Sequence, residues 1–222
     1  MWTALLFLLS GFAGAWLVTA HPGLVALFAS PEMIASVERG ELWTVNLLNV
    51  VPSSVLSIQL LTNNIVVSLF AFCAGILFGL GTFYIVGLNG FMLGGVFAFT
   101  AQHGLAQRLF EFIVAHGIVE VACMVLAGAA GVSLGEALVR PAGASRTAAF
   151  SRAARRAGKL LVPIGLLLAG CGFIEGFVSP DPDVPLWARL VIGVGYFGIM
   201  IALLRGGFPG RHRHHGLRPI RT

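Results

Sequence analysis

Six long apolar stretches constrain this chain more than any other feature of its sequence. They lie near residues 2–20, 65–86, 88–102, 111–134, 160–178 and 186–204. A helix crosses the bilayer core with about 20 apolar residues. The chain is 57% hydrophobic and only 10% charged, whereas soluble domains carry about 25% charged residues. We therefore expect an all-α, polytopic membrane helical bundle of about six transmembrane helices, with residues 1–205 as one transmembrane domain.

Positive charge gathers at two places in the sequence. One cluster lies between Arg140 and Lys159, and the other begins at Arg205 and continues through the basic tail, residues 206–222. Lys and Arg are enriched on the cytoplasmic side of membrane proteins. We therefore expect both termini in the cytoplasm and the tail close to anionic lipid. The net charge of +5 then reflects topology, and no nucleic-acid partner is expected.

The first stretch and the segment after it leave alternatives open. Residues 2–20 end in a small-residue pattern typical of signal-peptide cleavage, but no basic region precedes them, so a retained span is favoured. Ser30, Pro31 and Glu32 form a helix start and Gly40 a helix end, which predicts a short extracytoplasmic helix over 31–39. A second short helix from Pro52 to Leu61 is predicted to lie along the membrane surface or to pack on the spans.

The joint between the second and third stretches has the sequence GLNG. It is too short for anything but a tight turn, and Asn and Gly tolerate the backbone angles of such turns. We therefore expect a turn at Asn89 and Gly90.

Several polar residues fall at membrane depth. Ionisable residues within spans are costly, usually face the protein interior and mark function. His116 and Glu120 are four residues apart, which places them on one helical face. Glu175 in the fifth span, and Asn63 and Asn64 at the start of the second, are predicted to meet them in the outer half of the bilayer. We call these five residues the candidate polar cluster.

Three kinds of chemistry suit the candidate polar cluster. It could be a hydrogen-bonded lock that fixes helix packing, or a proton or substrate relay in a transporter. It could also bind metal, since His116 and Glu120 offer two ligands and Glu175 a third. The HExxH motif of zinc hydrolases does not occur in the sequence. We therefore expect no enzymatic activity, no metal and no cofactor, with an intramembrane metallohydrolase as the least favoured reading.

Four short motifs resemble those of the stage II sporulation protein M family of integral membrane proteins. They are a Thr-Asn-Asn opening, an Asn-Gly turn, His-Gly-x-x-Glu and Ile-Glu-Gly-Phe-Val-Ser-Pro, in that order along the chain. The matching positions are Thr62, Asn63, Asn64, Asn89, Gly90, His116, Gly117, Glu120, Glu175, Gly176 and Pro180. Many relatives carry a soluble stretch before the first span, and a truncated start site would explain why this chain begins at that span.

The resemblance implies a membrane scaffold that holds peptidoglycan-remodelling partners at a septum, although many relatives occur in bacteria that do not sporulate. We therefore expect a scaffold or assembly factor of the bacterial cell membrane, linked to cell-envelope remodelling. Its partners would be the lipid bilayer and membrane or envelope proteins. Glycines at four-residue spacing also suit a homo-oligomer. The main alternative is a transporter or channel-like protein that uses buried Glu and His.

Overall fold

The computed structural model describes residues 2–43, 53–141, 143 and 145–206. Every regular element in that part of the chain is helical, which confirms the all-α prediction. In chain order the elements are α1 (Trp2–Ala20), η1 (Pro22–Leu27), α2 (Pro31–Glu38), α4 (Ser53–Cys73), η2 (Ala74–Ile76), α5 (Leu80–Gln102), α6 (Ala106–Ile113), α7 (Gly117–Val139), α8 (Arg146–Phe173), η3 (Ile174–Val178) and α9 (Leu186–Gly206). Six of these helices, some continued by a short helical turn, are long and apolar enough to cross a membrane.

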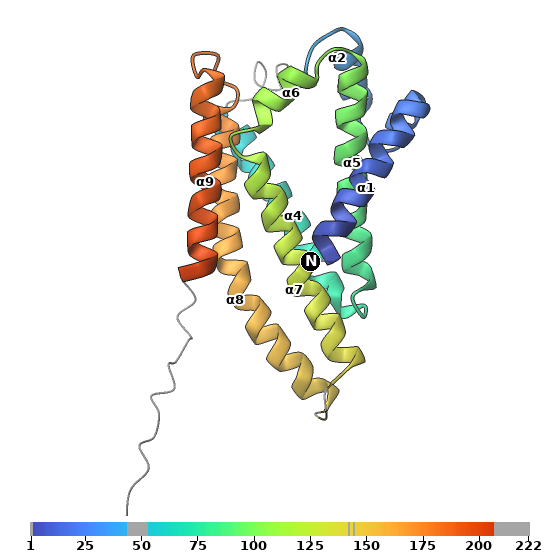
Figure 1. The fold of residues 1–222 in the computed structure, drawn as a ribbon, viewed down its shortest axis with the longest axis vertical. Helices are drawn as coiled ribbons and strands as arrows, with labels where there is room; N and C mark the ends of the chain where they lie inside the picture. Colours follow the sequence, from blue (N-terminus) through green and yellow to red (C-terminus); the bar gives the residue numbers. More distant parts are fainter. Residues whose placement is uncertain (1, 44–52, 142, 144, 207–222) are drawn as a thin grey trace, which may run out of the picture.

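The spanning helices pack around α7. Figure 1 shows α1 crossing α5 on one side of the bundle and α8 beside α9 on the other, with α7 between them. α7 contacts α4, α5, α8 and α9. The hydroxyl of Tyr196 on α9 donates a hydrogen bond to the carbonyl oxygen of Leu167 on α8, 2.6 Å away. α7 is therefore the helix from which side chains can contact α4, α5, α8 and α9.

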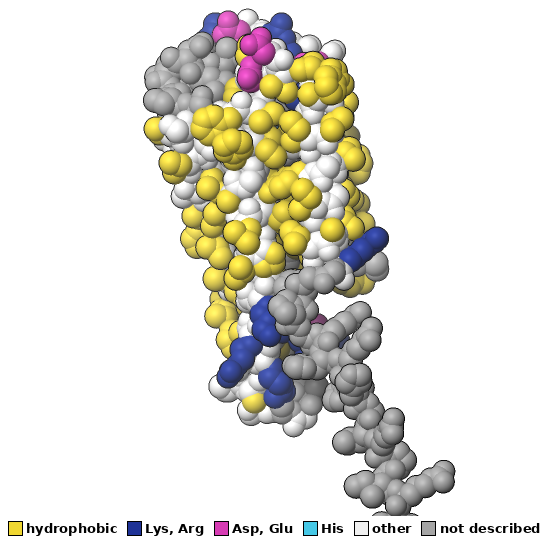
Figure 2. All heavy atoms as spheres, turned by 90° about the vertical axis from the view of Figure 1, so that its left-hand side faces the viewer, with side chains coloured by type: hydrophobic (Ala, Val, Ile, Leu, Met, Phe, Trp, Pro, Cys, Tyr) yellow, Lys and Arg dark blue, Asp and Glu magenta, His cyan; other side chains and the backbone are white. Residues whose placement is uncertain are grey.

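The surface of the bundle is that of a membrane protein. Figure 2 shows a broad band of hydrophobic side chains across the middle of the molecule, with Lys and Arg at the end that holds the start of α8. Large apolar side chains such as Phe12 on α1 and Leu166 on α8 are exposed to 74% and 70%. A continuous apolar surface of this kind is stable in lipid and would aggregate in water.

The predicted helix over 31–39 is confirmed as α2. The hydroxyl oxygen of Ser30 accepts a hydrogen bond from the backbone N–H of Met33, and Gly40 follows the helix with φ of 81°. The prediction of a separate short helix from Pro52 to Leu61 is wrong for the residues that the structure describes. Residues 53–61 are helical, but they form the first turns of the continuous helix α4. Thr62 does not interrupt α4, since its hydroxyl bonds the carbonyl oxygen of Ile58 on the preceding turn.

The predicted turn at Asn89 and Gly90 is also wrong. Both residues lie inside α5, and the chain reverses earlier, where Phe78 and Gly79 have φ of 54° and 84°. Asn89 donates to the carbonyl oxygen of Ile85 in its own helix. A Cβ at Gly90 would collide with the carbonyl oxygen of Phe7 on α1. Gly90 therefore serves close helix packing and not a turn, and the second and third spans are 57–76 and 80–102.

The fourth and fifth spans differ from their predicted bounds as well. The stretch predicted over 111–134 is broken between Ile113 and Gly117, so that α6 is separate and α7 runs on to Val139. α8 begins at Arg146, earlier than predicted, because Ser145 caps the helix by accepting from the N–H of Ala148 and its charged first turns are solvent-exposed. The first and last spans have nearly the predicted bounds. The tail from 207 onward lies outside the described residues.

Candidate functional site

Three helical segments bring the predicted polar residues together. His116 occupies the N-cap position of α7, without a capping bond from its side chain. Its carbonyl oxygen accepts the N–H of Glu120, so the two residues are one turn apart as predicted. Glu175 lies in η3, where the bond from the N–H of Ser179 to the carbonyl oxygen of Ile174 makes a wide, π-type turn. Such π-type turns are frequently found at functional sites. Asn64 comes from the middle of α4.

His116 joins α7 to the end of α8 and η3. The imidazole is 2% exposed, and its Nδ1 lies 3.0 Å from the hydroxyl oxygen of Ser179. The thiol of Cys171 lies 3.8 Å from the carbonyl oxygen of His116. We call this set of contacts the His116 junction. Sequence reasoning missed Ser179 and Cys171, although Ser179 belongs to the same Ile-Glu-Gly-Phe-Val-Ser-Pro motif as Glu175.

Two carboxyl groups lie beside the imidazole. Nε2 of His116 is 3.8 Å from Oε1 of Glu175, and ligand atoms of His116, Glu120 and Glu175 all lie within 4.8 Å of one another. Glu175 is 9% exposed, and its buried Oε2 has no hydrogen-bond partner among the described residues. We call these three residues the His-Glu-Glu group; by their chemistry they could hold a divalent metal ion.

The structure separates the two asparagines of the candidate polar cluster. Nδ2 of Asn64 donates to Oε1 of Glu120 over 2.7 Å, which ties α4 to α7. Asn63 is more exposed and lines the cavity beside Glu120, but among the residues that the structure describes it makes no hydrogen bond to the group. The cluster therefore contains Asn64 but not Asn63.

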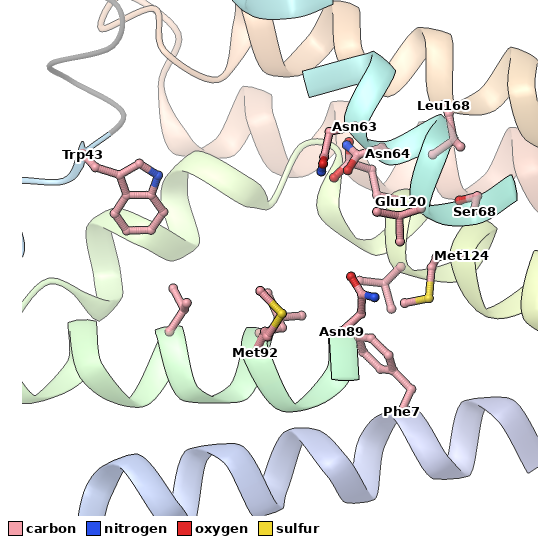
Figure 3. A pocket seen from close by; sticks show the side chains of 14 residues that line it. Phe7, Trp43, Asn63, Asn64, Ser68, Asn89, Met92, Glu120, Met124 and Leu168 are labelled. Carbon is pink, nitrogen blue, oxygen red and sulfur yellow. The ribbon is translucent and has the colours of Figure 1, made fainter. Parts of the chain in front are cut away.

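A cavity of about 330 Å³ adjoins the group on the side of Glu120. Figure 3 shows Asn64 and Glu120 on the wall formed by α4 and α7, with Asn89 on α5 opposite them. The remaining lining is mostly apolar and includes Trp43 and Met92. His116 and Glu175 do not line it. The site thus has a sealed part, the His116 junction, and a part that faces a cavity, Glu120 with Asn64.

The profile of one protein family, described as stage II sporulation protein M, matches residues 3–180. The chain belongs to this family. The matched residues extend from α1 to just beyond η3. They therefore include every residue of the His-Glu-Glu group and of the His116 junction. α9 lies beyond the matched residues. No curated protein and no solved structure matches the chain.

Proposed function

We propose that this protein is a non-enzymatic scaffold or assembly factor of the bacterial cytoplasmic membrane, with both termini in the cytoplasm and a role linked to cell-envelope remodelling. The observation that carries the proposal is the His116 junction, in which a buried imidazole bonds Ser179 across the interface of α7 with the end of α8. Buried, satisfied polar contacts rigidify a bundle. A rigid bundle presents fixed outer helix faces, which is what a docking platform needs.

The outer face of α9 offers a surface for partners. Among the described residues, no heavy atom lies within 4 Å of a Cβ built at Gly195 or Gly198, and both glycines are exposed. Small residues allow close helix contact in membranes, where association depends on packing. We propose that a transmembrane helix of an envelope protein packs on this face; a second copy of this chain is the other outcome.

In-cell crosslinking tests the scaffold proposal. A photo-reactive residue in place of Val194, which is 72% exposed beside the two glycines, should give a discrete protein adduct. The same residue in place of Phe12 on α1 should give lipid adducts only. Gly198→Leu fills the face without touching the core, so it should remove the Val194 adduct. Absence of any protein adduct at Val194 under all growth conditions would count against the scaffold.

A second candidate, a transporter or channel-like protein, is favoured by one observation. Glu120 and Asn64 face a cavity of about 330 Å³ at membrane depth. A carboxyl group beside an opening can exchange protons as a pathway changes. Vesicles with the purified protein and an internal pH-sensitive dye would then show a proton flux that Glu120→Gln abolishes. If no flux depends on Glu120 or Glu175, this candidate is removed.

A further inference from the structure

The His-Glu-Glu group has the composition and spacing of a metal site. We propose that His116, Glu120 and Glu175 together bind one divalent transition-metal ion of the Zn²⁺ type. Zn²⁺ lies about 2.0–2.1 Å from imidazole nitrogen and about 2.0–2.2 Å from carboxylate oxygen, so ligands around a tetrahedral ion are about 3.4 Å apart. Nε2 of His116 and Oε1 of Glu175 are already 3.8 Å apart, and all three ligand atoms lie within 4.8 Å.

The carboxyl groups of Glu120 and Glu175 contact each other, and their other partners leave a ligand atom on each residue for an ion. Nδ1 of His116 is engaged by the hydroxyl of Ser179, so with the proton on Nδ1 the lone pair of Nε2 faces Glu175. Metal-binding histidines are commonly oriented in this way by a partner on the other ring nitrogen. Asn64 bonds Oε1 of Glu120, which leaves Oε2 for the ion. The donor set of one nitrogen and two oxygens suits Zn²⁺, Mn²⁺ or Co²⁺.

The charge and the burial of the His-Glu-Glu group also favour a bound cation. Two carboxylates beside a neutral imidazole carry two negative charges, which are costly at membrane depth unless a cation or protons compensate them. Among the described residues, no Lys or Arg forms an ion pair with Glu120 or Glu175. Oε2 of Glu175 is buried without a hydrogen-bond partner. A divalent ion neutralises both charges and gives the group a common partner.

The bound ion would brace the bundle where α7 meets the end of α8. His116 and Glu120 come from α7 and Glu175 from η3, while Asn64 links the group to α4. The cavity of about 330 Å³ borders the group at Glu120. The inference goes beyond the scaffold proposal, since the ion would be held whether or not a partner docks on α9.

Cobalt binding tests the site directly. The full chain is purified in mild detergent, stripped with a chelator and titrated with Co²⁺, whose visible absorption reports coordination. Because histidine is a common metal ligand, the tail histidines His212, His214 and His215 are changed to Ser in every sample. We expect one Co²⁺ per chain, displaced by Zn²⁺, and a rise in unfolding temperature on loading, because binding to the folded state stabilises it.

Matched variants locate the site. Glu120→Gln and Glu175→Gln should each weaken Co²⁺ binding at least 100-fold, whereas Glu136→Gln, an exposed position on the same helix as Glu120, should leave it unchanged. If Co²⁺ binding is unchanged in the Glu120→Gln variant and also in the Glu175→Gln variant, the proposal is overturned. So does a stripped parent chain that binds no Co²⁺, in which case the two carboxyls are neutralised by protons.

X-ray absorption of the Zn²⁺-loaded parent chain provides a test that does not depend on folding of the variants. We expect a first shell of nitrogen and oxygen with imidazole scattering. A sulfur shell would assign the ion to one of the cysteines Cys73, Cys123 and Cys171 and overturn the proposal.

Discussion

Adjacent residues on α4 differ in what they contact. Asn64 donates to the carboxylate of Glu120 on α7, while Asn63, one residue earlier, is more exposed and lines the cavity without a hydrogen bond to Glu120 among the described residues. Both are asparagines in the same helix with the same intrinsic propensity. Any difference between their variants therefore reports the contact across the helix interface.

Asn64→Ala should lower the free energy of unfolding by about 1.5–3 kcal/mol, the range for hydrogen bonds to charged groups. Asn63→Ala should change it by less than about 0.5 kcal/mol, as surface substitutions do. Unfolding in mixed detergent micelles, followed by circular dichroism, measures both. Equal effects of the two variants would mean that the Asn64–Glu120 bond does not hold α4 to α7.

At the scale of the helices, glycines set how closely α1 and α5 approach. A Cβ at Gly94 would collide with the backbone of Gly11, and a Cβ at Gly14 with the backbone of Phe91. A Cβ at Gly87, on the same helix, would meet only the side chain of Leu6 among the described residues, at 3.9 Å. The contact of α1 with α5 therefore depends on particular glycines and not on glycine content.

Gly94→Ala should cost about 1–3 kcal/mol of unfolding free energy, because backbone atoms of α1 must move to admit the methyl group. Gly87→Ala should be neutral or stabilise by up to about 1 kcal/mol through helix propensity. The same micelle unfolding assay compares them. A Gly94→Ala protein as stable as Gly87→Ala would contradict the close packing of α1 on α5.

The corrected turn before α5 can be tested through Gly79. With φ of 84°, Ala at this position should cost about 1–2 kcal/mol, the penalty for an L-residue in the left-handed region. Asn tolerates that region through local hydrogen bonds, so Gly79→Asn should recover part of the loss. If Ala and Asn at position 79 are equally stable, backbone strain is not the cause.

For the whole molecule, the two ends of the bundle differ in charge and in connections. Figure 1 places α2 and α6 at one end and the junction of α7 with α8 at the other. Figure 2 shows mainly Lys and Arg at the end with the start of α8, whereas Lys and Arg lie together with Asp and Glu at the opposite end. The excess of positive charge inside the cell predicts that this end is cytoplasmic.

Cysteine labelling tests the orientation. In a Cys73→Ala background, where the remaining thiols Cys123 and Cys171 are buried, Asp183→Cys should react with a membrane-impermeant maleimide on intact cells. Thr147→Cys, near the start of α8, should react only after the cells are permeabilised. The opposite pattern would invert the topology.

The sequence by itself determined the membrane class, the number of spans and the family. These follow from apolar stretches, charge placement and short motifs, which are properties of consecutive residues. It also predicted the short helix α2, because its capping residues act on their own backbone. It placed the turn at Asn89 and Gly90 wrongly, since glycine in a membrane helix serves packing as well as turns, and only the position of α1 distinguishes the two uses.

Only the tertiary structure decided how the candidate site is built. The meeting of His116, Glu120 and Glu175 was expected from their depths, but the sequence does not reveal that Asn64 joins them and Asn63 does not. It also does not reveal Ser179 as the partner of His116, or the cavity on one side of Glu120. These features depend on how α4, α7 and the end of α8 are rotated against one another. That rotation is set by contacts between residues far apart in the chain.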